Sequence, residues 1–132
     1  MGNVIDGDTL AAGPRRIRLH GIDAPELEQR CQNGREPVDC GSVAAEELRS
    51  LVSGTRVTCK IAERDRYKRE IGTCFRDDGM NINERMVESG WAIAYRRYSH
   101  AYDKAEAYAR SRRLGLWSGT FEPPEEWRAR MH

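Results

Sequence analysis

The sequence predicts an α+β fold in which five short strands form a small β-barrel and three helices pack against it. Several short runs alternate apolar and polar residues between turn residues, as strands do. Three other stretches have the apolar spacing or the end signals of helices. At 132 residues the chain is long enough for one domain with a modest core. We expect that domain to span residues 1–118, with a C-terminal tail at 119–132 packed on it.

The first three strands are expected near the N-terminus. Val4 and Ile5 begin a short strand, and the run from 10 to 14 leads through a Gly-Pro turn into a strand over 17–22. This order predicts a hairpin. The polar, irregular stretch over 27–41 is expected to be a loop.

The middle of the chain predicts a helix and a second hairpin. Ser42 is expected to cap the helix and Gly54 to end it. Alternating runs over 56–61 and 71–75 predict two paired strands, joined by a charged connection over 63–70. The buried face of the helix repeats apolar residues at helical spacing: Ala44, Leu48, Leu51 and Val52.

The last third predicts two more helices. Met80 and Ile82 are expected to continue as a short strand into a helix over 83–89, and a longer helix follows over 100–113. The tail after residue 118 shows no signal of a helix or strand. Five short strands and three helices fit an OB-like barrel.

Four cysteines allow three pairings. Cys31 and Cys40 bracket the predicted loop, and Cys59 and Cys74 lie on the two strands of the second hairpin. We therefore favour bridges within each of these pairs. Two bridges predict an oxidising compartment, hence a secreted or periplasmic protein. The alternative is four reduced thiols in a cytoplasmic protein.

Charge and hydropathy limit the classes of function. The formal net charge is only +1, so any surface for a polyanion must come from local clustering. The densest basic stretch, over 96–113, can attract a polyanion or simply be a solvated helix face. No apolar run is long enough to span a membrane, so we expect no membrane partner. Met1 and Gly2 can mark the start left after removal of a leader.

Two short acidic clusters lie close together near the N-terminus. The first contains Asp6 and Asp8, and the second is an apolar strand that ends in Asp23 and Glu26. Carboxylates crowded in a fold repel one another, and a bound hard cation keeps them ionised. Two strand ends that carry acids therefore predict a metal site.

Two further residues bear on this prediction. Gly7 is expected to allow a sharp turn between the two acids of the first cluster. Arg18 precedes Asp23 on a run too apolar for a loop, which favours a built site. The alternative is that these acids belong to ordinary turns and face water.

Three motifs, in this order and spacing, resemble the staphylococcal nuclease (thermonuclease) family. They are I-D-G-D-T at 5–9, R-L-H-G-I-D-A-P-E at 18–26 and D-R-Y-K-R at 65–69. Later landmarks, including G-W-A at 90–92 and L-G-L-W-S at 114–118, also fit. The resemblance covers nearly the whole chain. It implies a monomeric, calcium-dependent endonuclease for DNA and RNA, with single strands preferred, little sequence preference and 3′-phosphate products.

The resemblance also implies a metal site. Asp8 and Asp23 would bind one Ca²⁺ directly, together with the backbone carbonyl of Ala24. The family often has threonine at that last position, and a main-chain ligand is compatible with the change. Glu26 would lie in the outer metal shell and act on the attacking water, as general base or by orienting it. Mg²⁺ or Mn²⁺ suit the same oxygen ligands, so calcium rests on the resemblance.

Substrate contacts follow from the same resemblance. Arg18 and Arg69 would clamp the phosphate, because a planar guanidinium can donate two parallel hydrogen bonds to phosphate oxygens. Tyr67, Tyr95 and Tyr98 would hold the nucleotide by a hydroxyl or a ring. The alternatives are a solvated charge run for the second arginine and a place in the core for the tyrosines.

Two other classes of function remain as alternatives. One is a catalytically inactive nuclease-like module that binds nucleic acid. Such domains typically lose acids or arginines, whereas this chain keeps Asp8, Arg18, Asp23, Glu26 and Arg69. The other is an OB-like module for protein or glycan partners, for which the sequence offers no positive feature.

Overall fold

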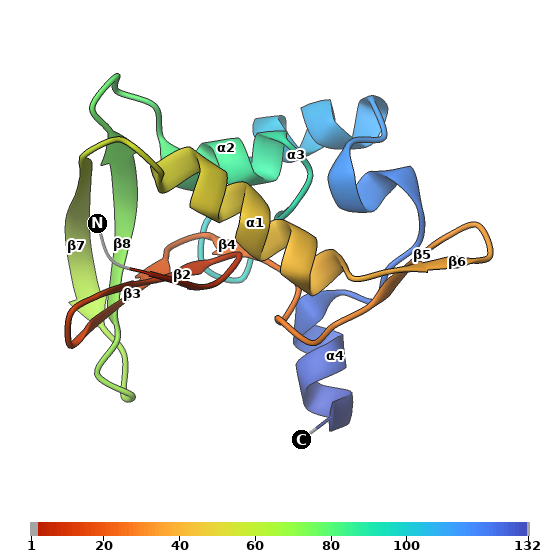
Figure 1. Cartoon of the computed structure of the whole chain (residues 1–132), viewed down its shortest axis with the longest axis horizontal. Coiled ribbons are helices and arrows are strands. Elements are labelled where there is room, and N and C mark those ends of the chain that lie inside the picture. Colours follow the sequence, from red (N-terminus) through yellow and green to blue (C-terminus); the bar gives the residue numbers. More distant parts are fainter. Residues whose placement is uncertain (1–2, 132) are drawn as a thin grey trace.

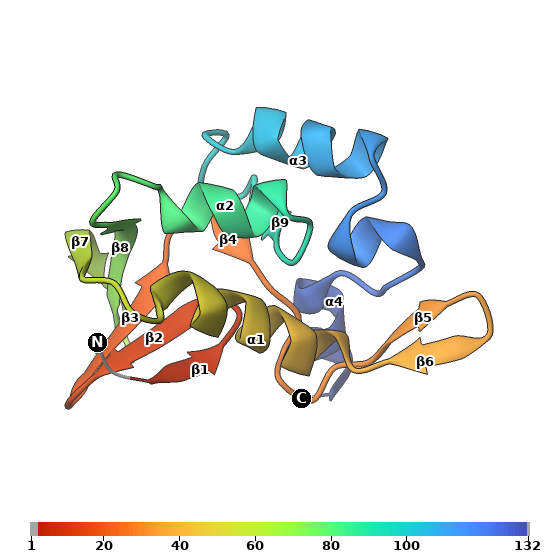
Figure 2. The same cartoon turned by 45° about the horizontal axis from the view of Figure 1, so that its top comes forward.

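The computed structural model describes residues 3–131. Met1 and Gly2, where a leader was thought to have been removed, lie outside the described residues. A five-stranded mixed sheet has the order β1-β2-β3-β8-β7. Helix α1 crosses over this sheet. Helix α2 lies between α1 and α3, and α3 lies farther from the sheet (Figures 1 and 2).

Strands β1 (Val4–Asp6), β2 (Thr9–Ala12) and β3 (Arg15–Leu19) pair antiparallel in chain order, which confirms the first predicted hairpin. The register places Thr9 opposite Arg18. The two acids of the first cluster thus flank the connection between β1 and β2, beside the arginine of β3.

The second predicted hairpin is also confirmed. Strand β7 (Val57–Arg64) pairs antiparallel with β8 (Glu70–Arg76), and both strands are longer than expected. Strand β8 then pairs in parallel with β3, with Arg18 opposite Ile71. This parallel pairing carries the turn at 65–69 to the same edge as Arg18.

The sheet does not close into the predicted barrel. Its edges are β1 and β7, which do not pair with each other within residues 3–131. The single strand expected over 17–22 is broken after Leu19, where Gly21 takes a φ of 81°. Beyond this bend, β4 (Ile22–Asp23) pairs with β9 (Ile93–Ala94) instead. The α+β assignment fits this mixed sheet with helices around it.

The stretch predicted as a loop contains a small hairpin. Strands β5 (Cys31–Asn33) and β6 (Glu36–Val38) pair antiparallel around Gly34, whose φ is 66°. The hairpin projects from the body of the molecule (Figures 1 and 2). The loop prediction was wrong because a distant segment fixes this stretch: Gln32 exchanges backbone hydrogen bonds with Thr120. The predicted Cys31–Cys40 disulfide also closes the base of the hairpin.

Helix α1 (Cys40–Val52) buries the predicted apolar face against the core. It begins two residues before Ser42, with Asp39 as the residue before its first turn, so the prediction of Ser42 as the cap was wrong. Gly54, at φ 72°, follows its end as expected.

Two more predicted helices are present; the first begins one residue earlier than expected at the same length, and the second is shorter than expected. They are α2 (Ile82–Glu88) and α3 (Asp103–Ser111). The side chain of Asn81 caps α2 by accepting the N–H of Glu84. The strand expected before α2 is reduced to one isolated bridge between Phe75 and Asn81.

A further helix lies in the C-terminal tail, where the sequence predicted none. After a 3₁₀ turn, η1 (Gly115–Ser118), helix α4 spans Pro124–Met131 and begins with a proline at a position that suits it. It is short and lacks an apolar stripe, which is why it was missed. Figure 1 shows α4 on the side of the molecule opposite α3.

The structure forms two disulfides, Cys31–Cys40 and Cys59–Cys74, the pairing that the predicted elements favoured. Two disulfides in a small domain suggest an extracellular or periplasmic protein. No helix within residues 3–131 combines the length and the apolar character needed to cross a bilayer.

Candidate active site

A cleft of about 510 Å³ opens where β3 and β8 lie side by side. It gathers side chains from the N-terminal strands, the β7–β8 turn, the segment after β9 and helix α4. The candidate residues that line it are Asp6, Asp8, Arg18, Glu26, Tyr67, Arg69, Tyr95, Tyr98 and Arg128.

Asp8 is buried and bound from three sides. It accepts the backbone N–H of Ala24 at 2.8 Å and the hydroxyl of Thr9 at 3.1 Å, and Arg18 lies 3.2 Å away. Burial raises the pKa of Asp8, but Arg18 and the hydrogen bonds outweigh it and hold the pKa below its ordinary value. Asp8 is therefore ionised at neutral pH.

Asp6 joins Asp8 at the cleft, although no role was predicted for it. Its Oδ1 accepts the N–H of Asp8 at 3.1 Å. Burial and the negative charge of Asp8 raise the pKa of Asp6 to about 8. The presence of Asp6 in the same acidic cluster was the signal that could have identified it.

Gly7 lies in the turn between these acids, but close packing also demands a glycine there. A Cβ atom at this position would lie 2.7 Å from the Cβ of Ala24 and 2.8 Å from that of Ala44. The missing side chain lets the acidic turn pack directly on α1 and on the residue that binds Asp8.

Asp23, at the end of β4, has a fully buried side chain and lies behind the cleft. Arg128 holds it with two contacts, Nη1 to Oδ1 at 2.9 Å and Nη2 to Oδ2 at 3.2 Å. Arg18 Nη2 lies 3.5 Å from Oδ1. Burial still raises the pKa of Asp23 to about 6, because it outweighs both arginines.

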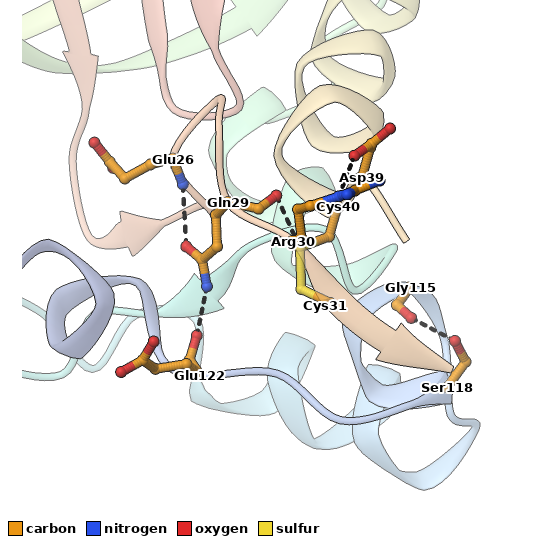
Figure 3. Close-up of a disulfide and its surroundings, with 9 residues drawn as sticks. All are labelled: Glu26, Gln29, Arg30, Cys31, Asp39, Cys40, Gly115, Ser118 and Glu122. Carbon is orange, nitrogen blue, oxygen red and sulfur yellow. Dashed lines mark hydrogen bonds and ion pairs between the residues drawn. A yellow bond between two sulfur atoms is a disulfide. The ribbon is translucent and has the colours of Figure 1, made fainter. Parts of the chain in front are cut away.

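Glu26 follows on a short corner of the chain. Its N–H donates to Oε1 of Gln29 at 3.2 Å, and Nε2 of Gln29 donates to the carbonyl of Glu122 at 2.7 Å (Figure 3). The carboxylate is partly exposed to the cleft, with Oε2 3.1 Å from Arg128. Its position thus depends on the C-terminal tail as well as on the acidic motif.

Arg18 is fixed more rigidly than the sequence could show. Besides its two carboxylate partners, its Nη1 donates to the carbonyls of Leu19 and Ile22, at 3.2 Å and 3.0 Å. These carbonyls become available because the chain bends between β3 and β4. The guanidinium is therefore held at the wall of the cleft.

Arg69 enters from the β7–β8 turn. Asp65 organises this turn by accepting the N–H groups of Tyr67 and Arg69, both at 2.9 Å. Its other oxygen accepts Nε of Arg69 at 2.7 Å. Arg69 is thus oriented by its own turn and lines the cleft, which disfavours the interpretation as a solvated charge run.

The three tyrosines differ in their exposure and in their contacts. Tyr67 and Tyr98 are 67% and 61% exposed, so these two do not belong to the core. The ring of Tyr95 meets that of Tyr98 edge to face at 5.0 Å. The hydroxyl of Tyr95 donates to Glu125 of α4, a contact that no sequence signal indicated.

Part of the basic stretch over 96–113 is neutralised. Arg96 pairs with Glu106 at 2.7 Å and with Asp103 at 3.1 Å, and Arg97 pairs with Glu125 at 3.1 Å. The first two arginines of the stretch therefore form ion pairs within the molecule. This weakens the interpretation of the stretch as one continuous surface for a polyanion.

Arg128, like Asp6, is a site residue for which the sequence predicted no role. It lies 105 positions from Asp23, in a tail without a recognisable motif. No local signal could have identified it, because its partners are set by the docking of α4.

The donor chemistry of the site suits a hard cation. No group of three or more His, Cys, Asp or Glu side chains is arranged to hold a metal ion in the described part of the chain, 3–131. The cluster nevertheless offers carboxylate oxygens, and Asp23 and Glu26 together already hold one positive charge, the guanidinium of Arg128. The acids thus fit a hard cation, while the carbonyl of Ala24 stays a prediction.

The raised pKa values predict how stability depends on pH. In the unfolded chain an aspartate titrates near 3.8, whereas folding raises the pKa of Asp6 to about 8 and that of Asp23 to about 6. Between about pH 4 and pH 8 the folded state therefore binds more protons than the unfolded state. In chelator, the stabilisation that these two aspartates contribute is complete below about pH 4 and is lost as the pH rises to about 8.

Asp6→Asn should remove much of this loss, on the order of a few kcal/mol at high pH. Urea unfolding at several pH values checks this, with the exposed Asp77→Asn as control. An equal pH dependence in the parent and Asp6→Asn would contradict the prediction.

Comparison with known proteins gives the following matches. A family described as "Staphylococcal nuclease homologue" matches residues 16–119. An uncharacterized endonuclease of Escherichia coli O157:H7 is 38% identical, over 96% of this chain and 82% of its own length. The succinoglycan biosynthesis protein ExoI of Rhizobium meliloti is 40% identical, over 89% and 63% respectively. A probable staphylococcal-like nuclease of Oryza sativa subsp. japonica is 34% identical, over 92% and 35%.

Proposed function

Because this chain belongs to the staphylococcal nuclease family, as its motifs indicated, we propose that it is a calcium-dependent endonuclease. It hydrolyses phosphodiester bonds of DNA and RNA and leaves 3′-phosphate ends. The observation that carries the proposal is the convergence of Asp8, Arg18, Glu26 and Arg69 on one cleft. Relatives that are named endonucleases support the same class of reaction.

The divalent cation would be held by Asp8 and Asp23, with the carbonyl of Ala24 as a third ligand and Glu26 in the outer shell. When bound, it would supply positive charge to the phosphate oxygens and to the leaving oxygen. Ca²⁺ is the expected ion, and Mg²⁺ or Mn²⁺ suits the same oxygen donors.

The chain's own side chains would activate the water and bind the phosphate. The partly exposed carboxylate of Glu26 would orient the attacking water or accept its proton. Arg18 and Arg69 would donate hydrogen bonds to the phosphate oxygens as these become more negative. The rigid contacts of Arg18 and the Asp65 pair of Arg69 support this role, because donors held in place need no reorganisation during the reaction.

The exposed rings of Tyr67 and Tyr98 would stack on bases, and Tyr95 would support Tyr98. Stacking and phosphate contacts do not distinguish bases, so we expect little sequence preference. Splayed bases are available in single strands, which we expect to be preferred.

Residues 1–118 would then form the nuclease domain, with 119–132 docked on it. The two disulfides support a secreted or periplasmic location, outside the reducing cytoplasm. We expect the protein to act as a monomer.

Digestion of a single-stranded DNA oligonucleotide tests the proposal. The protein is incubated with Ca²⁺, Mg²⁺, Mn²⁺ or a chelator, and the product ends are identified by phosphatase treatment and electrophoresis. We expect cutting that requires a divalent cation, is fastest in Ca²⁺ and leaves phosphatase-sensitive 3′ ends. A protein that binds the strand but cuts it in none of these cations would instead be a nucleic-acid-binding module without catalysis.

A further inference from the structure

The C-terminal helix places a positive charge on the carboxylates at the centre of the site. Arg128 of α4 contacts both oxygens of Asp23, at 2.9 Å and 3.2 Å, and one oxygen of Glu26 at 3.1 Å. Its side chain is only 29% exposed. A bidentate, largely buried contact of this kind is stronger than an ordinary surface ion pair.

Several other contacts hold the tail in this position. Gln29 bridges the N–H of Glu26 and the carbonyl of Glu122 (Figure 3). Glu125 accepts the hydroxyl of Tyr95 and pairs with Arg97 at 3.1 Å. The docking of α4 is therefore built into the same segments that carry the site.

The contact with Arg128 uses the atoms that a metal ion would need. Both oxygens of Asp23 are occupied by the guanidinium, and Asp23 is fully buried, so water cannot screen the two charges well. A divalent cation bound to Asp23 would repel a guanidinium in the present position. Cation and guanidinium thus compete for the same carboxylate.

We propose that Arg128 is an internal counter-cation that must leave Asp23 when a divalent cation binds, and that it thereby sets the cation affinity of the site. The inference rests on the proposed function, because it assigns Asp23 as a metal ligand. It adds to that function a residue of the tail, outside the three motifs.

Calorimetric titration with Ca²⁺ tests the inference on the full chain. Arg128→Gln removes the competing charge, and we expect its Kd for Ca²⁺ to fall by about tenfold or more relative to the parent. The titration is done near pH 8, so that loss of the arginine does not leave Asp23 protonated. Arg130→Gln is the matched control: it removes the same charge from the same helix, but Arg130 is 60% exposed and pairs with Glu122.

A second variant weakens the docking of α4 without changing Arg128, Asp23 or Glu26. Glu125→Gln weakens the contacts of the helix with Tyr95 and Arg97, and it should also lower the Kd, by a smaller factor. Thermal unfolding supplies an independent readout. In chelator, Arg128→Gln should unfold at a lower temperature than the parent, and saturating Ca²⁺ should narrow that difference.

The outcomes separate the two proposals. If the parent binds Ca²⁺ and Arg128→Gln binds it equally or more weakly, the inference is wrong while the proposed metal site stands. If neither the parent nor any variant binds Ca²⁺, Mg²⁺ or Mn²⁺, the metal dependence in the proposed function is wrong and this inference falls with it. Should Arg128→Gln fail to fold, the Kd of Glu125→Gln decides.

Discussion

Glu26→Gln is expected to lower kcat/KM on single-stranded DNA roughly 10²- to 10⁴-fold, because an amide cannot accept the proton of the attacking water. The substitution keeps the size of the side chain. Asp23 keeps its own contacts with Arg128, so the fold should change little. Initial rates in saturating Ca²⁺, measured over a range of substrate concentrations, check the prediction.

Glu28→Gln is the matched control for this variant. It lies two residues away on the exposed part of the same segment and does not line the cleft. Its rate should equal that of the parent. Strand binding in chelator should stay close to the parental value for both variants. A Glu26→Gln protein that retained most of its rate would remove Glu26 from the catalytic step.

Arg18→Met is expected to cost about 3–5 kcal/mol of unfolding free energy in chelator, because it leaves buried Asp8 without its guanidinium partner, whereas Asp23 keeps Arg128. Both carboxylates lie within 3.5 Å of its guanidinium. Catalysis should fall as well, by about 10²- to 10³-fold, through loss of a donor to the phosphate. Urea unfolding and initial rates check the two effects separately.

Arg16→Met is the control on the same strand. Arg16 is exposed and lies outside the cleft, so the same change there should leave stability within about 0.5 kcal/mol of the parent. Arg18→Lys should recover part of the stability but little of the rate, since an ammonium cannot reproduce the planar, multiple donation of a guanidinium. Equal stability of Arg18→Met and the parent would show that Asp8 does not depend on Arg18 to compensate its buried charge.

The sequence determined the parts of the site that lie within short motifs. Asp6, Asp8 and Arg18 follow from strands whose pairing is set by alternation and by a tight turn. Arg69 is oriented by Asp65 within its own turn, so its geometry is also local. The two hairpins, the buried face of α1 and the disulfide partners were predictable for the same reason.

Other features depend on contacts between distant parts of the chain. The sheet remains open because β4 bends away at Gly21 and pairs with β9, about 70 positions later. The β5–β6 hairpin exists because Thr120 and a disulfide hold it. Neither β9 nor Thr120 can be identified from the local sequence pattern of the segment that it fixes.

The charge state of the site shows most clearly which features depend on the sequence and which on the tertiary structure. The sequence determined that several acids and arginines meet near one sheet edge, and therefore that a cation is expected there. Only the tertiary structure decided that Asp23 is fully buried and that Arg128, from a helix without an apolar stripe, holds it. The physical reason is that motifs determine which charges are present, whereas burial and docking determine how strongly those charges interact.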